Sequence, residues 1–78
     1  MARHGIHVFV NSRKMELDSR ELTGAELLQR AGFETKHWDI YRLENPSDLK
    51  GSRVTCEETL QVRDGDFFRV IQGHASCG

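Results

Sequence analysis

The stretch LTGAELLQRAGF, from Leu22 to Phe33, carries signals for the beginning of a short helix. Thr23 is followed three residues later by Glu26, which is the capping-box spacing. In a capping box, each of the two side chains accepts a hydrogen bond from a backbone N–H group at the helix start. Leu22 and Leu27 are also spaced to pack against each other as a hydrophobic staple. The sequence therefore predicts a helix with Thr23 as its N-terminal cap.

The same stretch predicts where this helix ends. Gly32 has no side chain and can adopt the left-handed backbone conformation that commonly closes a helix. Phe33, directly after it, can then fold back onto Leu28. We therefore expect a helix of only about two turns. Its apolar face would consist of Leu27, Leu28 and Ala31.

Alternating apolar residues before the helix predict a β-hairpin. In GIHVFVN, from Gly5 to Asn11, every second residue is aliphatic, which is typical of a strand with one buried face. The polar turn NSRK follows, and the alternation resumes with Met15 and Leu17. We expect one face of the first strand to carry Ile6, Val8 and Val10, and the other to carry His7 and Phe9.

Further strands are expected after the helix. HWDIYRLE, from His37 to Glu44, reads as a strand with apolar residues on both faces, so the pattern leaves its inward face open. Asn45-Pro46 ends it, and the polar stretch up to Glu58 forms a long connection with a short strand near Val54. The runs TLQV and FFRVI, joined through RDGD, predict a second hairpin with an Asp64-Gly65 turn.

The predicted order is hairpin, helix, strand, long loop and hairpin, within 78 residues. One helix can cover one face of a single sheet, so we expect a two-layer α+β domain. The right-handed crossover rule places the first and last strands side by side at the centre of the sheet. The expected fold is a β-grasp, with a four- or five-stranded mixed sheet packed on one helix. Residues 1–72 would form the domain and residues 73–78 a flexible tail.

The composition favours a globular protein whose partners are not selected by charge. Hydrophobic residues make up 37% of the chain, charged residues 29%, and the net charge is −1. Positive and negative side chains are almost equal in number, whereas a dedicated nucleic-acid binder carries an excess of positive charge. No nucleic-acid partner is therefore expected. The sequence shows no signal peptide and no apolar run near the ~18 residues of a membrane span. We therefore expect a cytoplasmic monomer that does not bind membranes.

No residues suggest a cofactor, a metal site or catalysis. We expect Cys56 and Cys77 to be free thiols, because cytosolic proteins keep cysteines reduced. The histidines and cysteines lack the CxxC or HxxxH spacing of a zinc site. There is no nucleophile elbow, phosphate-binding glycine loop or shielded pair of carboxylates, so we do not expect an enzyme. Turn formation alone accounts for Asp64 and Asp66.

Three segments resemble the bacterial multiubiquitin-domain family, whose ubiquitin-like proteins are encoded beside activating and conjugating enzymes in bacterial ubiquitination-like operons. The segments are IHVFVNSRKMELDSRELTGAELLQRAGF, WDIYRLE and LQVRDGDFFRVI, and they extend from Ile6 to Ile71. The last segment also resembles the closing hairpin of the sulfur-carrier proteins of thiamine and molybdopterin synthesis, which share the fold. Two features depart from these families: the domain is present once, and the sequence ends in Cys77-Gly78 rather than a double glycine.

The resemblance implies a protein modifier of antiphage defence that acts through its C-terminal carboxylate. Its partners would be an activating enzyme, a conjugating enzyme and a deconjugating peptidase. Gly78 would be the conjugation site, because glycine has no side chain to collide with the nucleotide or the attacking thiol. Gly73 would be the pivot of the tail, which continues through His74, Ala75, Ser76 and Cys77.

A partner-binding surface is expected on the face of the sheet that points away from the helix. If the helix covers Val8 and Val70, alternation turns their neighbours to the opposite face. That surface would consist of Phe9, Phe67, Arg69 and Ile71, joined by Ile40 if Tyr41 and Leu43 point inward. Two other functions remain open: a sulfur carrier with a C-terminal thiocarboxylate, and a non-covalent ubiquitin-like binding module.

Overall fold

The helix α1, Gly24–Arg30, begins at the predicted capping box. The Thr23 N–H donates to Glu26 Oε1 at 2.8 Å, and the Glu26 N–H donates to Thr23 Oγ1 at 3.2 Å. The first helical N–H, that of Gly24, donates to the carbonyl of Glu58 at 3.1 Å. Backbone donors at a helix start have no partner within the helix, so the cap and the segment around Glu58 together satisfy them.

The end of α1 also follows the prediction. Gly32 has a φ of +89°, in the left-handed region that favours glycine. Its N–H donates to the carbonyl of Gln29 at 3.1 Å, and the Phe33 N–H donates to the carbonyl of Leu28 at 2.9 Å. This pair of bonds is the Schellman motif, which closes a helix after the left-handed residue.

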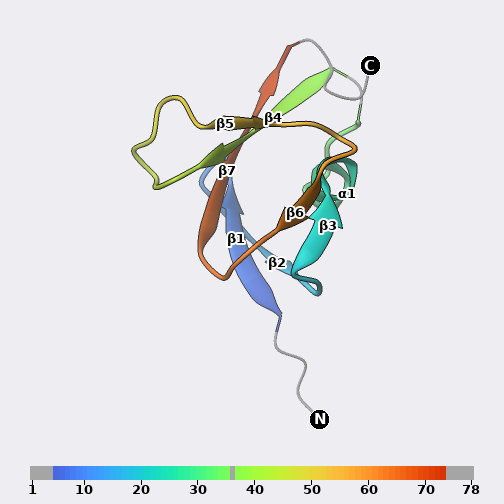
Figure 1. Cartoon of the computed structure of the whole chain (residues 1–78). Coiled ribbons are helices and arrows are strands. Elements are labelled where there is room, and N and C mark those ends of the chain that lie inside the picture. Colours follow the sequence, from blue (N-terminus) through green and yellow to red (C-terminus); the bar gives the residue numbers. More distant parts are fainter. Residues whose placement is uncertain (1–4, 36, 74–78) are drawn as a thin grey trace.

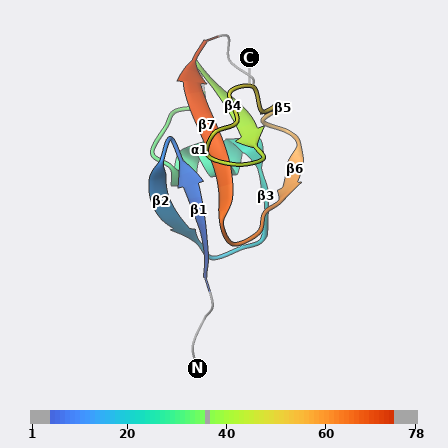
Figure 2. The same cartoon turned by 90° about the vertical axis from the view of Figure 1, so that its left-hand side faces the viewer.

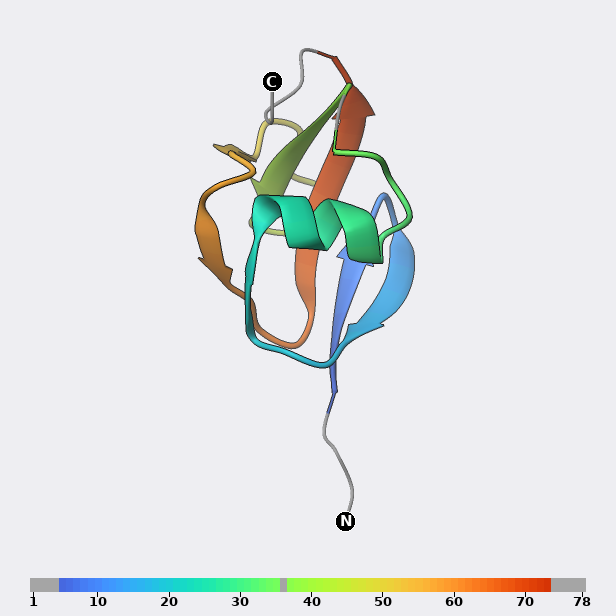
Figure 3. The ribbon, with the colours of Figure 1, turned by 90° about the vertical axis from the view of Figure 1, so that its right-hand side faces the viewer.

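Five strands form one mixed sheet, in the order β2-β1-β7-β4-β5. The computed structural model describes residues 5–35 and 37–73. In it β1 and β7 are parallel, and all other neighbours in this sheet are antiparallel. The helix lies across one face of the sheet (Figure 3), so the expected α+β architecture of the β-grasp type is confirmed. The strands are β1 (Ile6–Val10), β2 (Arg13–Leu17), β4 (Trp38–Leu43), β5 (Ser52–Val54) and β7 (Asp66–Gln72).

The core lies between the sheet and α1. Alternate residues of each central strand face the helix, as the period of two in a strand requires. Within residues 5–35 and 37–73, no helix has the length and apolar character needed to cross a membrane. The largest fully buried side chains are Val8, Leu17, Leu27, Leu28, Ile40 and Phe68.

The predicted second hairpin is wrong. β6 (Thr59–Gln61) pairs with a strand that the sequence did not suggest, β3 (Glu21–Thr23), in a separate two-stranded sheet (Figure 1). Since β7 already has β1 on one side and β4 on the other, it has no free edge for β6. The Asp64-Gly65 pair instead joins the two sheets: the His7 N–H donates to Asp64 Oδ1 at 2.7 Å, and the Gly65 N–H donates to the carbonyl of His7 at 2.6 Å.

The turn between β1 and β2 is shorter than the polar run NSRK suggested, because β2 already begins at Arg13. Asn11 and Ser12 both have positive φ, +53° and +68°. Two such residues give a turn whose twist matches that of the flanking strands. The hairpin itself is confirmed, with Val10 opposite Arg13 and Ile6 opposite Leu17.

Candidate functional site

The central strand β7 leads directly into the segment predicted as the reactive tail. Its pairing with β4 continues to Gln72, and the Gly73 N–H then donates to the carbonyl of His37 at 3.1 Å. Because β7 is parallel to β1, it ends at the side of the sheet opposite the start of β1 (Figure 1). The hydrogen bond to His37 anchors Gly73 to the segment before β4. The remaining predicted tail residues, His74, Ala75, Ser76, Cys77 and Gly78, lie outside the described residues.

The outer face of the sheet, which points away from α1, carries a row of large apolar side chains. Phe9 of β1 lies opposite Phe67 of β7, and Phe67 lies opposite Leu43 of β4. The two phenyl rings stack, with centroids 5.1 Å apart and an interplanar angle of 20°. Figure 2 shows β1 and β7 side by side on this face, in front of α1. The structure thus brings two of the predicted partner-binding residues into contact.

A shallow pocket of about 240 Å³ lies over these rings. Phe9 and Phe67 line it from the sheet, and Leu43 adds an aliphatic side chain from β4. Pro46, in the loop between β4 and β5, lines it as well. Asn11, Ser12 and Arg69 also line the pocket, so its lining combines apolar and polar side chains from the sheet, the β1–β2 turn and the β4–β5 loop.

Arg69 lies on the outer face, but its guanidinium binds within the chain. Nη1 donates to the carbonyl of Leu49 at 2.9 Å, and Nη2 donates to the carbonyl of Asp48 at 2.9 Å. The side chain thereby holds the β4–β5 loop against β7. That loop displays Leu49, whose exposed fraction of 84% is large for a leucine.

The same loop is organised around the carboxylate of Asp48. Oδ2 accepts from the Glu44 N–H at 3.0 Å, while Oδ1 accepts from the Lys50 N–H at 3.0 Å and the Gly51 N–H at 3.1 Å. The Glu44 bond, and then those from Lys50 and Gly51, hold the pKa of Asp48 below its ordinary value of 3.8. The ionised carboxylate therefore fixes the loop shape.

The suggestion that Ile40 joins this surface is wrong. Ile40 is 0% exposed and lies opposite Val70, another core residue. Tyr41 and Leu43 consequently point outward, so the face gains Leu43, which the sequence did not single out. Ile71 is 42% exposed, near the end of β7. An odd number of positions separates Leu43 from Ile40, so the two side chains lie on opposite faces of β4. This spacing places Leu43 on the outer face only once Ile40 is known to point inward.

The expectation of a free thiol is wrong for Cys56. This residue is disulfide-bonded and buried, after β5 and beside the start of α1, where its carbonyl accepts from the Ala25 N–H at 3.2 Å. Cys77, the other cysteine in the sequence, lies outside the described residues. In the part of the chain that the structure describes, no three His, Cys, Asp or Glu residues are grouped to hold a metal ion.

Comparison with known proteins adds no relative to this description. No family model matches the chain, and no curated protein and no solved structure is significantly similar to it. Functional inference therefore rests on the fold, on the course of β7 toward Gly73 and on the outer face of the sheet.

Proposed function

We propose that this chain is a ubiquitin-like protein modifier that acts through the carboxylate of Gly78. The observation that carries the proposal is the strand order β2-β1-β7-β4-β5 with one covering helix, in which the central strand β7 leads to Gly73. Modifiers and carriers of this fold present their reactive carboxylate on the segment that follows that strand. The resemblance of the three segments between Ile6 and Ile71 to the bacterial multiubiquitin-domain family supports the same assignment, with a role in antiphage defence.

The proposed chemistry is acyl activation in two steps. The Gly78 carboxylate attacks the α-phosphorus of ATP, an acyl adenylate forms, and pyrophosphate leaves. A cysteine thiolate of the activating enzyme then attacks the acyl carbon, so a thioester forms and AMP leaves. Since the enzyme supplies nucleotide binding and nucleophile, the chain itself needs no catalytic residue. A conjugating enzyme and a deconjugating peptidase would act on the product.

The outer face is the proposed docking surface for the activating enzyme. Phe9 and Phe67 offer stacked, partly exposed rings beside a pocket, and Ile71 extends apolar surface along β7 toward Gly73. A partner bound there would lie next to the segment that carries the carboxylate. Clustered exposed apolar side chains are a common feature of protein interfaces, because burying them is favourable.

The test is intact mass spectrometry of the full chain with a candidate activating enzyme and ATP, alongside a chain that lacks Gly78. We expect an adenylate or a covalent enzyme adduct only when Gly78 is present. The absence of any adduct with an enzyme shown to be active on another substrate would refute the modifier.

Two results would favour the other functions. A mass increase of about 16 Da in the presence of a sulfur donor, as oxygen is replaced by sulfur, would identify a sulfur carrier. Enzyme binding that survives removal of Gly78, without any adduct, would identify a non-covalent binding module. The pocket over Phe9 and Phe67 is the observation that favours this second candidate.

A further inference from the structure

Cys56 takes part in a disulfide bond at a defined place in the fold. It is buried, and its carbonyl accepts from the Ala25 N–H at 3.2 Å, so it lies beside the first turn of α1. The sequence contains one other cysteine, Cys77, directly before the proposed conjugation site Gly78. Within one chain, a disulfide of Cys56 therefore requires Cys77 as its partner.

The sheet topology places Cys56 on the side of the sheet where β7 ends. β5 and β7 are both antiparallel to β4, so they run in the same direction. β7 ends with Gln72 opposite Trp38, and β5 ends with Val54 opposite Ile40, two residues before Cys56. Only β4 lies between them, and neighbouring strands are about 4.8 Å apart. The ends of β5 and β7 are thus separated by about 10 Å across the sheet.

The residues after β7 are numerous enough to span this separation. From Gly73, the last described residue, to Cys77 an extended chain reaches at most about 14 Å. A disulfide requires the Cα atoms of its two cysteines to lie within about 7 Å of each other. Cys77 can therefore bond to Cys56 while Gly73 keeps its hydrogen bond to His37.

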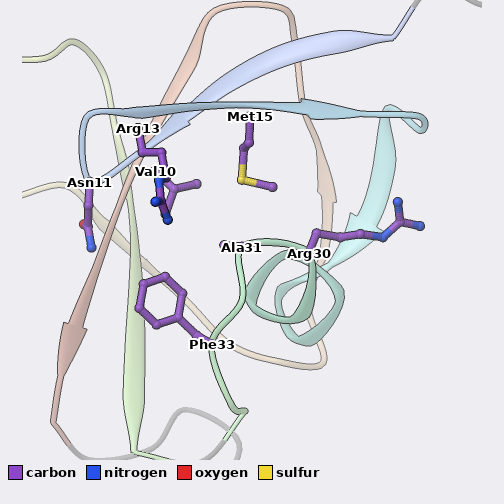
Figure 4. A pocket seen from close by; sticks show the side chains of 7 residues that line it. All are labelled: Val10, Asn11, Arg13, Met15, Arg30, Ala31 and Phe33. Carbon is purple, nitrogen blue, oxygen red and sulfur yellow. The ribbon is translucent and has the colours of Figure 1, made fainter.

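Such a tether determines where the reactive carboxylate can go. Gly78 follows Cys77 directly, so the bond would hold its carboxylate near the first turn of α1. Figure 4 shows the opposite end of this helix, where Ala31 and Phe33 border a groove of about 360 Å³ beside β2, so the tether point is distinct from that groove. Adenylation requires the carboxylate to approach the α-phosphorus of ATP inside an enzyme. A chain end bonded to its own domain cannot enter such a site.

We propose that the Cys56–Cys77 disulfide is a redox lock, which withholds the Gly78 carboxylate from activation until a dithiol reductant opens it. This regulation rests on the proposed modifier function. In the opening step the sulfurs of Cys56 and Cys77 each gain one electron and one proton. The two thiols of the reductant lose two electrons and two protons and become a disulfide, through a mixed-disulfide intermediate.

Peptide mapping of the full chain establishes the linkage. Trypsin cleaves after Arg53, Arg63 and Arg69, so residues 54–63 and 70–78 should be recovered as one linked species when no reductant is present. Dithiothreitol should separate them and raise their summed mass by about 2 Da, because two hydrogens are gained. Alkylation of both thiols in the unreduced, denatured chain would overturn the proposal, as would a disulfide that joins two copies of the chain.

Release of Gly78 by a carboxypeptidase measures the accessibility of the chain end without any activating enzyme. We expect the reduced chain to lose Gly78 at least about tenfold faster than the oxidised chain, because the protease acts on the open form. Cys56→Ala removes the tether and keeps the core apolar, so its Gly78 should be released rapidly with or without dithiothreitol. Cys77→Ser, which leaves the buried Cys56 in place, provides a second untethered chain if Cys56→Ala does not fold.

Native NMR spectra of the reduced chain and of the variants would show that rapid release does not reflect unfolding. Equal release of Gly78 from the oxidised and the reduced chain would overturn the lock.

Adenylate formation with a candidate activating enzyme then tests the regulation. Pyrophosphate release is the readout, because this step precedes attack by the cysteine of the enzyme. We expect kcat/KM to be at least about tenfold lower for the oxidised than for the reduced chain, since the competent form is scarce. Cys56→Ala should react equally under both conditions, which excludes an effect of dithiothreitol on the enzyme.

The two proposals fail in different ways. Equal activation of the oxidised and the reduced chain would overturn the lock and leave the modifier function in place. If neither the reduced chain nor Cys56→Ala forms an adenylate, the modifier function fails, while the peptide map and the release of Gly78 still decide whether the disulfide holds the chain end.

Discussion

At the scale of single residues, Asn11 continues β1 beyond its last strand residue. Its Oδ1 accepts from the Val70 N–H at 2.8 Å, and its Nδ2 donates to the Val70 carbonyl at 3.0 Å. The side-chain amide therefore imitates the next peptide group of a β-strand and pairs with β7. Asparagine also tolerates the left-handed conformation of the turn better than most residues. One side chain thus links the turn to the centre of the sheet.

Replacing the Asn11 side chain should lower the free energy of unfolding. Asn11→Ala removes two hydrogen bonds and leaves the partly buried Val70 N–H and C=O without them, so we expect about 2 kcal/mol loss in the free energy of unfolding. The matched control is Ser12→Ala, which also has positive φ but should cost less than about 0.5 kcal/mol. Urea denaturation of both variants measures the difference. Equal losses would mean that the turn conformation, and not the Val70 pairing, determines the effect.

Gly24 fixes how closely α1 approaches the loop after β5. A Cβ atom at this position would meet the carbonyl oxygen of Thr55, and this backbone carbonyl itself accepts from the Glu58 N–H. Gly24→Ala should therefore displace the loop and cost about 3 kcal/mol, despite the higher helix propensity of alanine.

The control for this variant is Gly32→Ala. There the added Cβ meets no atom within 4 Å, so only the backbone strain at a φ of +89° remains. We expect a cost of about 1 kcal/mol for that strain. Thermal unfolding of the two variants should rank Gly24→Ala as clearly less stable, and the reverse order would contradict the close approach.

At the scale of elements, the β4–β5 loop should respond to acid through Asp48. The folded-state pKa of Asp48 lies below its ordinary value of 3.8, because three backbone N–H groups bond the ionised carboxylate. Its stabilising contribution is thus present above that value and is lost as the pH falls through the folded-state pKa. We expect the amide shifts of Lys50 and Gly51 to titrate together, with a midpoint below 3.8.

Asp48→Asn provides the control. The asparagine side chain retains an oxygen that can accept from the Lys50 and Gly51 N–H groups, but it loses the charged acceptor of the Glu44 N–H. Since asparagine does not ionise, the titration of the Lys50 and Gly51 amide shifts should disappear. A midpoint at or above the ordinary value in the unmodified chain would contradict the assigned role of Asp48.

The elements that the sequence predicted well are those specified by local contacts. Thr23, Glu26 and Gly32 act within a few residues of themselves, so the ends of α1 could be read directly. The alternation of Ile6, Val8 and Val10 identified β1 because one face of that strand is buried and the other is partly exposed. These local signals were enough to order the elements into the β-grasp architecture.

The errors concern pairings between distant segments. β3 and β6 are three-residue strands, too short for alternation to be visible, and Leu22 had already been assigned to the helix staple. The Asp-Gly pair then made β6 and β7 look like a hairpin, although its bonds go to His7. The face of β4 could not be chosen either, because Ile40 and Leu43 are both aliphatic and only the register with β7 decides between them.

At the scale of the whole molecule, the two faces of the sheet differ in burial. The face toward α1 holds the buried core, while Phe9 and Phe67 remain partly exposed on the other. The β4–β5 loop, bound through Arg69, borders the exposed rings. Within residues 5–35 and 37–73, β2 lies at one edge of the sheet and pairs only with β1. The proposed tail chemistry and the proposed outer-face docking can therefore be tested by separate substitutions.

Phe67→Ser tests the outer face within this scheme. The substitution removes one of two stacked rings, so we expect a loss of about 1 to 2 kcal/mol in unfolding free energy and a folded protein at 25 °C. If the activating enzyme docks on this face, kcat/KM for adenylate formation should fall at least about tenfold, mainly through KM, because the lost contact aids binding rather than chemistry. The matched control is Gln29→Ser, exposed on α1 at the opposite face, which should leave kcat/KM unchanged. Equal activation of both variants would assign Phe9 and Phe67 to stability alone.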